Sequence, residues 1–218
     1  VRAAADATLA ARRSGPLSVV VKSTVPIGTN DRLQARLDAS DAQAGAASIH
    51  LASNPEFLRE GAAIDDFMQP DRIVVGPRDS VAAGALRRLN QRFIDAGVAY
   101  VEVSASSAEM IKYAANAFLA TKITFINEVA SLCERVGANV EDVAHGIGLD
   151  QRIGSAFLAT GPGYGGSCFP KDTLALVDTA QVEGSPVRIL EAVIDVNEAR
   201  KREMATKVIE ALGGLDQA

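Results

Sequence analysis

Cys168 is the residue of this sequence whose surroundings best suit covalent chemistry. It follows the glycine-rich stretch 161–167, and glycine lets a ligand approach the backbone closely. Pro170 can begin a helix directly after it, which places Lys171 and Asp172 in the first turn. A helix N-terminus and a nearby lysine favour the thiolate, the form of cysteine that attacks carbon. We therefore expect Cys168 to be a nucleophile.

The glycines of 161–166 also match the G-x-G-x-x-G spacing of dinucleotide-binding loops. That motif works only after a strand and before a helix in a βαβ unit. Here the glycines follow a helical stretch, so we expect them to support the thiol and not a cofactor pyrophosphate. The second cysteine, Cys133, lies in an apolar helical stretch and is predicted to be a buried structural residue.

Lys112 and Asn116 are four residues apart, so they project from one face of a predicted helix. Two such donors could stabilise an oxyanion during acyl or carbonyl chemistry. The spacing alone favours a surface lysine beside an interface asparagine.

Glu56 and Glu60 have the same spacing after Asn54 and Pro55. This pattern predicts a helix capped by Asn54 with Pro55 in its first turn. Glu56 would then either complement the helix dipole or act as a general base on water.

Thr24 lies just beyond a predicted strand, where α/β sheets bind ligands, although an ordinary turn also explains it. Arg152 could clamp a carboxylate or phosphate, and a solvated charge is the alternative. His50 and His145 have no partners at the spacing of a metal site or a catalytic triad, so we expect no metal.

Alternating strands and helices in the first half predict an α/β layer with a mostly parallel sheet. The expected strands are 17–21, 47–52, 73–76 and 98–103, and the expected helices are 3–13, 30–38 and 78–96.

Strand patterns end near residue 103, and the rest of the chain is predicted to be helical. The expected helices are 106–136, 139–147, 150–159, 171–183 and 186–212. The middle of the first, 113–126, is apolar nearly all round, which indicates burial, in part by a second subunit. We therefore place a domain boundary between residues 103 and 104.

Composition excludes several classes of protein. With 22 Lys+Arg against 27 Asp+Glu, the net charge is 22 − 27 = −5, and the scattered basic residues argue against nucleic-acid binding. No apolar run reaches the roughly 18 residues that a membrane span needs. Two cysteines and no signal-peptide pattern favour a reducing, cytoplasmic setting. The chain starts within a predicted helix without a methionine, so we expect a fragment.

Taken together, these motifs resemble the nucleotide-sugar dehydrogenases of the UDP-glucose/GDP-mannose dehydrogenase family. The matching stretches are 22–29, 53–61, 70–76, 109–128 and 161–172. The resemblance implies that 1–103 is the C-terminal part of a Rossmann-like NAD domain and that 104–218 is a central helical dimerisation domain. It also implies a two-step, NAD-dependent oxidation of a sugar C6 alcohol to a carboxylate, with UDP-glucose as the expected substrate.

The resemblance implies catalytic roles for Cys168, Lys112, Asn116, Asp172, Glu56 and Thr24. It implies cofactor contacts for Thr24, Glu60 and Lys171. It implies substrate contacts for Glu56, Lys112, Asn116, Arg152, Phe157, Tyr164 and Gly165. Cys168 would carry a thiohemiacetal and then a thioester, with Lys112 and Asn116 stabilising the oxyanion. Arg152 would extend into the site of a neighbouring subunit of a homodimer.

The family also has a dinucleotide fingerprint before this region and an α/β domain after it, and neither is present in these 218 residues. The sequence therefore does not decide whether these 218 residues oxidise the substrate without those two parts. GDP-mannose or a UDP-N-acetylhexosamine is the alternative substrate. A non-catalytic dimerisation module is the alternative function.

Overall fold

The computed structural model describes residues 3, 7, 17–44 and 49–214. The chain forms two compact units, Val1–Lys112 and Tyr113–Ala218, which we describe separately. The helix expected over 3–13 falls almost wholly outside the described residues.

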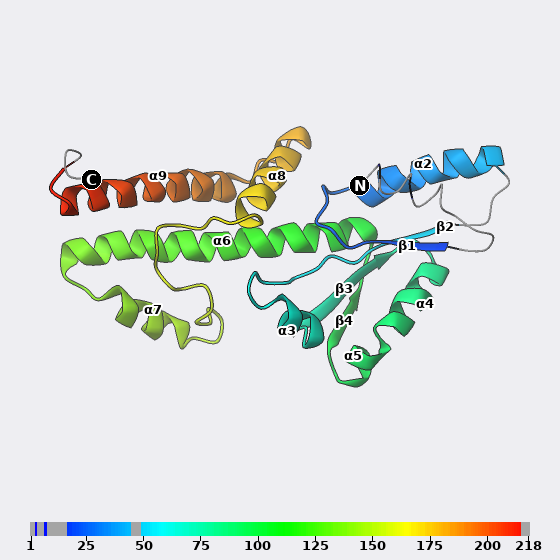
Figure 1. The fold of residues 1–218 in the computed structure, drawn as a ribbon, viewed down its shortest axis with the longest axis horizontal. Helices are drawn as coiled ribbons and strands as arrows, with labels where there is room; N and C mark the ends of the chain where they lie inside the picture. The colour runs from blue at the N-terminus through cyan, green and yellow to red at the C-terminus, as the bar shows by residue number, and fades with distance from the viewer. Residues whose placement is uncertain (1–2, 4–6, 8–16, 45–48, 215–218) are drawn as a thin grey trace. The chain divides into compact units, whose positions relative to one another are not determined.

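The first unit is built on a four-stranded sheet of order β1-β2-β3-β4 (Figure 1). The strands are β1 Leu17–Val21, β2 Ile49–Ser53, β3 Arg72–Pro77 and β4 Ala99–Glu102. The pairs β1–β2 and β3–β4 are parallel, whereas β2 and β3 are antiparallel through a short register. The four strands agree with the prediction within two residues, and the sheet is mixed because its central pair is antiparallel.

The described part of this unit contains four helices beside the sheet: α2 Thr29–Ala44, α3 Ala63–Met68, α4 Ser80–Leu89 and α5 Gln91–Asp95. Ala82 and Leu86 of α4 pack with Ala52 and Val75 of the sheet to form a buried core. The single helix expected over 78–96 is divided at Asn90, whose Nδ2 donates to the carbonyl of Leu86 at 2.8 Å. An asparagine side chain that bonds to the local backbone competes with helix continuation, which explains the break.

The helix expected from Asn54 is wrong, because residues 54–59 have no regular structure. The Asn54 side chain does not cap a helix. Its Oδ1 accepts from Lys22 Nζ at 3.1 Å and its Nδ2 donates to the carbonyl of Val74 at 2.8 Å. These tertiary hydrogen bonds occupy the groups that a helix cap would need. The six-residue α3 begins later and is not predicted by the sequence pattern.

The second unit contains most of α6 Ala105–Val136, followed by α7 Val140–Gly148, α8 Phe169–Val182 and α9 Arg188–Ala211 (Figure 1). The long helix agrees with its prediction within one residue. It ends at Gly137, whose φ of +73° suits a glycine C-cap. Over the described residues of the chain, no helix has both the length and the apolarity to cross a bilayer.

The helix expected over 150–159 is also wrong, since this segment consists of turns, bends and irregular backbone. The Asp150 carboxylate accepts from the backbone N–H of Arg152 at 2.9 Å, a local bond typical of turns. Gly154 and Phe157 then adopt φ values of +70° and +65°, which a helix cannot contain.

Candidate functional site

Three of the predicted site residues lie on two loops at one edge of the first unit's sheet. The parallel pairing of β1 with β2 places Val21 opposite Ser53, so the loops after both strands leave the same edge. The first loop carries Thr24 and the second carries Glu56 and Glu60. The hydrogen bond between Lys22 Nζ and Asn54 Oδ1 joins the two loops. The carboxyl edge of parallel strands is where α/β sheets bind ligands.

Lys112 of α6 is buried, with only 4% of its surface exposed. Its Nζ lies 3.7 Å from Glu56 Oε1 and 5.3 Å from the centre of the Phe57 ring. Because a buried ammonium needs a charged or polar partner, the Glu56 carboxylate compensates for its loss of water. The surface-lysine interpretation is therefore excluded.

Glu56 also lies near a second lysine, which the sequence patterns do not single out. Burial lowers the pKa of Lys22, and the Glu56 carboxylate opposes this shift by raising it. The other Glu56 oxygen, Oε2, accepts from the backbone N–H of Leu58 at 2.7 Å. Glu56 is thus an oriented carboxylate beside two ammonium groups, an arrangement suited to holding a water molecule.

Glu109 is a buried carboxylate that sequence reasoning did not select as a site residue. Its Oε2 accepts from the Gly28 N–H at 2.6 Å, and its Oε1 accepts from the Asn30 N–H at 2.9 Å and from Asn30 Nδ2 at 2.7 Å. These bonds satisfy backbone N–H groups at the start of α2 and hold the loop that carries Thr24. The three-residue spacing between Glu109 and Lys112, which places both on one face of a helix, is the sequence signal that could have identified Glu109.

In the second unit, Asn116 and Asp172 are brought together from distant positions in the sequence. Asn116 Nδ2 donates to Asp172 Oδ2 at 2.6 Å, and Lys171 Nζ donates to Asp172 Oδ1 at 2.5 Å. Asp172 is almost completely buried. Both oxygens of this carboxylate are therefore engaged by donors, which fixes its orientation.

Cys168 occupies the N-cap position of α8 and is partly exposed. Its carbonyl accepts from the Asp172 N–H at 2.9 Å, and its Sγ lies 3.6 Å from Ser167 Oγ. The helix begins two residues earlier than predicted, at Phe169, with Pro170 in its first turn. The thiol thus lies directly at a helix N-terminus.

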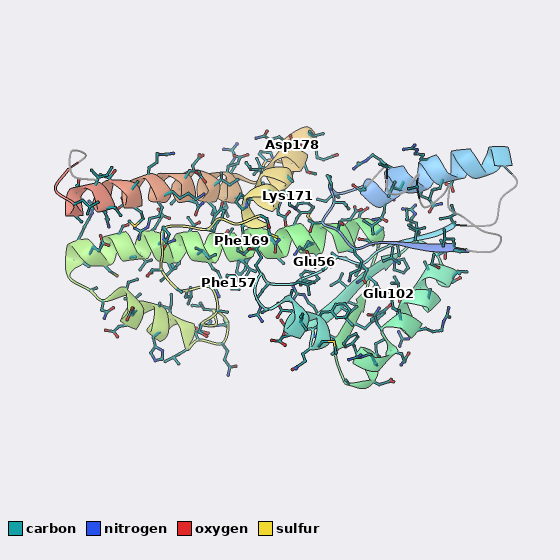
Figure 2. All side chains as sticks on the ribbon, viewed as in Figure 1. Glu56, Glu102, Phe157, Phe169, Lys171 and Asp178 are labelled. Carbon is teal, nitrogen blue, oxygen red and sulfur yellow. The ribbon has the colours of Figure 1, made fainter. Side chains whose placement is uncertain are left out.

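Aromatic side chains surround the start of α8. Phe169, labelled with Phe157 in Figure 2, makes an edge-on contact with Phe157 at 6.2 Å between ring centres. It makes another with Tyr164 at 6.0 Å. Tyr164 is buried, and this burial raises the pKa of its phenol. Gly165, the next residue, is exposed.

Arg152 is an exposed residue that contacts its near neighbour Asp150. Its side chain is 88% exposed, and its guanidinium pairs with Asp150 at 2.6 Å. Within the described part of the chain, no group of three or more His, Cys, Asp or Glu side chains is arranged to hold a metal ion.

Two models of one protein family match this chain in sequence. The family's NAD binding domain matches residues 1–94, and its central domain matches residues 106–199. The chain belongs to the UDP-glucose/GDP-mannose dehydrogenase family.

Relatives in this family support the assignment across nearly the whole chain. UDP-glucose 6-dehydrogenase of Rhizobium meliloti strain 1021 is 54% identical over 97% of this chain and 48% of that protein. UDP-glucose 6-dehydrogenase TuaD of Bacillus subtilis strain 168 is 47% identical over 99% of this chain and 45% of that protein. The chain spans about half the length of these relatives.

A solved structure shows the same fold. A UDP-glucose dehydrogenase from Pyrobaculum islandicum superimposes with a TM-score of 0.84 and 45% identity, covering 93% of this chain and 46% of that one. The α/β unit followed by a long helix is therefore the arrangement of a nucleotide-sugar dehydrogenase.

The carboxyl edge of β1 and β2 fits part of an NAD site. Polar side chains of Thr24 and Glu60 lie on loops that leave this edge, where nucleotide cofactors bind in α/β sheets. The first N–H groups of α2 do not contribute a phosphate site, because Glu109 already accepts from Gly28 and Asn30.

Proposed function

We propose that the protein containing this chain oxidises the C6 alcohol of UDP-glucose to the carboxylate of UDP-glucuronate, using NAD. The single observation that carries this proposal is that the predicted catalytic side chains are held in defined orientations within each unit separately. Lys112 pairs with Glu56, Asn116 bonds to Asp172, and Cys168 stands at a helix N-terminus. The relatives named UDP-glucose 6-dehydrogenase favour this substrate.

Cys168 supplies the covalent chemistry in this proposal. Converting an alcohol to a carboxylate removes two hydrides, and NAD is the hydride acceptor when bound. After the first oxidation, Cys168 Sγ bonds to the aldehyde carbon and gives a thiohemiacetal. The second oxidation leaves a thioester. Water then adds to its carbonyl carbon, and the carbon–sulfur bond breaks to return the Cys168 thiolate and release the carboxylate.

The charged and amide groups stabilise the oxygen at C6 and move protons. Lys112 and Asn116 are one helical turn apart on α6, and they donate to the oxyanion that forms when sulfur or water adds. Glu56, Asp172 and Thr24 hold the attacking water and accept its proton.

The remaining site residues bind the substrate and the cofactor in this proposal. Phe157, Tyr164 and Gly165 shape the nucleotide-sugar site beside Cys168, and Arg152 reaches the site of a second subunit. Thr24, Glu60 and Lys171 contact NAD. Residues 1–103 then form the cofactor domain and residues 104–218 the helical domain.

We further propose a homodimer formed through α6, located in the cytoplasm. Phe118, Phe125 and Leu132 are spaced seven residues apart, so they form one stripe along the helix. Their exposed fractions are 67%, 54% and 59%, an unusual amount of apolar surface for one helix face. The unpaired thiols Cys133 and Cys168 support a reducing compartment.

Turnover of the full-length protein with UDP-glucose and NAD tests the proposal. We expect two NADH per UDP-glucuronate, and Cys168→Ser should abolish acid formation while leaving the circular dichroism spectrum unchanged. Turnover of GDP-mannose or a UDP-N-acetylhexosamine in place of UDP-glucose would reassign the substrate. No NADH from any of them, together with no binding in an NAD titration, would favour a dimerisation module.

A further inference from the structure

The loop that precedes Cys168 is held by side chains from two helices. Residues 161–168 connect the turns after α7 to α8 and have no regular structure before the helix begins. Glycines at this density give a backbone with many accessible conformations. A loop that must present a thiol in one position therefore needs bonds from outside itself.

Asn197 of α9 supplies two of these bonds. Its Oδ1 accepts from the Tyr164 N–H at 2.8 Å, and its Nδ2 donates to the Tyr164 carbonyl at 3.1 Å. Asn197 is only 1% exposed, so water does not compete for these groups. One side chain thus satisfies both backbone polar groups of Tyr164, as a neighbouring strand would.

Gly163 shows how closely Asn197 approaches this loop. A Cβ atom at Gly163 would lie 2.8 Å from Asn197 Oδ1, which is too close for any side chain. The φ of Gly163 is +118°, a conformation that other residues rarely adopt. A glycine at position 163 is therefore required for Asn197 to form its paired bonds to Tyr164.

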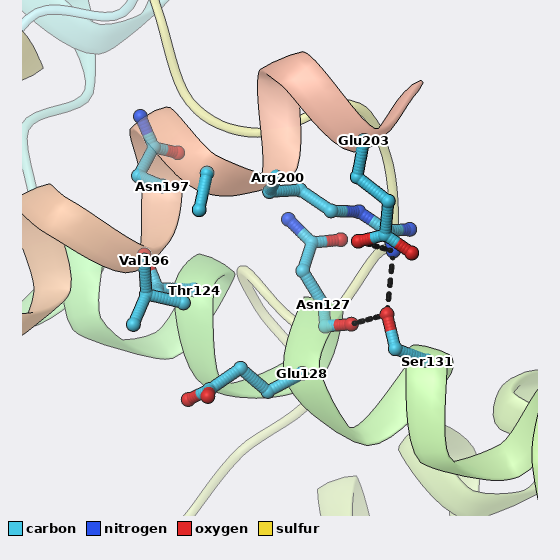
Figure 3. A pocket seen from close by; sticks show the side chains of 9 residues that line it. Thr124, Asn127, Glu128, Ser131, Val196, Asn197, Arg200 and Glu203 are labelled. Carbon is cyan, nitrogen blue, oxygen red and sulfur yellow. Dashed lines mark hydrogen bonds and ion pairs between the residues drawn. The ribbon is translucent and has the colours of Figure 1, made fainter. Parts of the chain in front are cut away.

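Two further side chains hold the beginning of the loop at Gly161. Asn127 Oδ1 of α6 accepts from the Gly161 N–H at 2.9 Å, and Arg200 Nε of α9 donates to the Gly161 carbonyl at 3.2 Å. Arg200 also donates to Ser131 of α6 at 2.8 Å. Asn127, Ser131 and Arg200 line a cavity of about 440 Å³ between α6 and α9. Figure 3 shows Arg200 reaching from α9 toward Ser131.

Tyr164, whose backbone is held by Asn197, is linked to Cys168 by packing. The Tyr164 ring contacts the ring of Phe169, which directly follows Cys168. A shift of the Tyr164 backbone would therefore move the first residue of α8 and the thiol beside it. We infer that Asn197, assisted by Asn127 and Arg200, is a positioning residue that fixes Cys168 for attack on the C6 carbon. The catalytic part of this inference rests on the proposed function.

Substitution of Asn197 tests this inference in the full-length protein. Asn197→Ala removes both bonds to Tyr164, and Asn197→Leu removes them while keeping a side chain of similar size. Hydrogen exchange of the peptide covering 161–168 should become about tenfold faster in both variants, because the loop opens locally. The value of kcat should fall about 10- to 100-fold, while the KM for the nucleotide sugar changes less than about threefold, since geometry and not binding is lost.

Arg202→Ala is the matched control, because Arg202 is an exposed residue of the same helix. It should leave both loop exchange and kcat unchanged. Loop exchange in the Asn197 variants equal to that of the parent protein would overturn the inference, whether or not the protein oxidises a nucleotide sugar. Faster exchange with unchanged kcat would also overturn it. A parent protein that oxidises no nucleotide sugar refutes the proposed function, and the exchange measurement still decides whether Asn197 orders the loop.

Discussion

Asn116 of α6 donates a 2.6 Å hydrogen bond to the carboxylate of Asp172 on α8, and the two side chains are only 7% and 1% exposed. These residues are 56 positions apart in the sequence. The bond fixes the helix that starts beside Cys168 against the long helix. It also leaves the second N–H of the Asn116 amide available as a donor to another acceptor.

Replacing Asn116 with alanine should therefore destabilise the protein. Asp172 would keep Lys171 on one oxygen and lose its donor on the other, and a buried unpaired acceptor costs about 1–3 kcal/mol. Urea unfolding followed by circular dichroism measures this loss. Gln181→Ala, at an exposed position of α8, is the control and should change the unfolding free energy by less than about 0.5 kcal/mol. Equal effects of the two substitutions would show that the bond adds no stability.

Alkylation should distinguish the two thiols. Cys168 is partly exposed at the start of α8, whereas Cys133 is buried within α6. Iodoacetamide should label Cys168 at least about tenfold faster than Cys133 in the folded protein, because accessibility and the helix N-terminus both favour it. Peptide mapping by mass spectrometry gives the two rates. Equal labelling of the native protein would contradict the assignment of Cys168 as the nucleophile.

The buried Glu109 carboxylate should be required for the stability of the first unit. Glu109→Ala leaves the N–H groups of Gly28 and Asn30 without their acceptor, at a cost of about 1–3 kcal/mol. Hydrogen exchange of the peptide covering 22–30 should also become faster, since the start of α2 loses its attachment. Glu102→Ala, an exposed carboxylate in β4, serves as the control. Unchanged exchange over 22–30 in the Glu109 variant would rule out this role.

Asp79 should stabilise α4 in a pH-dependent manner. It caps this helix by accepting from the N–H groups of Val81 and Ala82, and its Oδ2 lies 2.9 Å from His50 Nδ1. Partial burial acts to raise the pKa of Asp79, but the Ala82 N–H, the His50 ring and the Val81 N–H together outweigh it and lower the pKa. Asp79→Ala should cost about 0.5–2 kcal/mol near neutral pH.

The sign of the pH dependence follows from the lowered pKa of Asp79. A carboxylate with a lowered pKa in the folded state contributes stability above its unfolded pKa, and the contribution disappears as pH falls through the folded value. The difference in unfolding free energy between the parent and Asp79→Ala should therefore shrink as the pH falls below about pH 4. A difference that grows as pH falls through this range would contradict the capping role.

The sequence predicted the elements that depend on long apolar patterns and failed where single polar side chains decide the backbone. The 32-residue α6 and the four strands agree with their predictions because burial of a whole face determines them. The helix expected from Asn54 does not form because its side chain bonds to Lys22 and Val74, which are distant in sequence. Tertiary hydrogen bonds of this kind leave no periodic signal.

The candidate site was predictable to the extent that its residues lie within motifs. Lys112, Asn116 and Cys168 stand out by spacing or by neighbouring glycines. Asn197 gives no such signal, because it lies in an ordinary amphipathic helix and becomes notable only when Tyr164 is placed beside it. Residues that support a site through other residues are brought to it by tertiary contacts, and local sequence patterns do not identify them.

The apolar stripe of α6 should mediate self-association. Phe125 lies at the centre of the stripe, between Phe118 and Leu132, so a charge there would have to be buried without a partner in a dimer. Phe125→Glu should weaken the dimer by at least about tenfold in Kd, a modest figure for an unpaired charge in an apolar interface. Sedimentation velocity of the full-length protein at several concentrations measures this change. Leu149→Glu, which introduces the same charge at an exposed leucine outside the stripe, is the control and should leave association unchanged. A dimer that tolerates Phe125→Glu as well as it tolerates Leu149→Glu would show that another surface joins the subunits, and the stripe would then need a different partner.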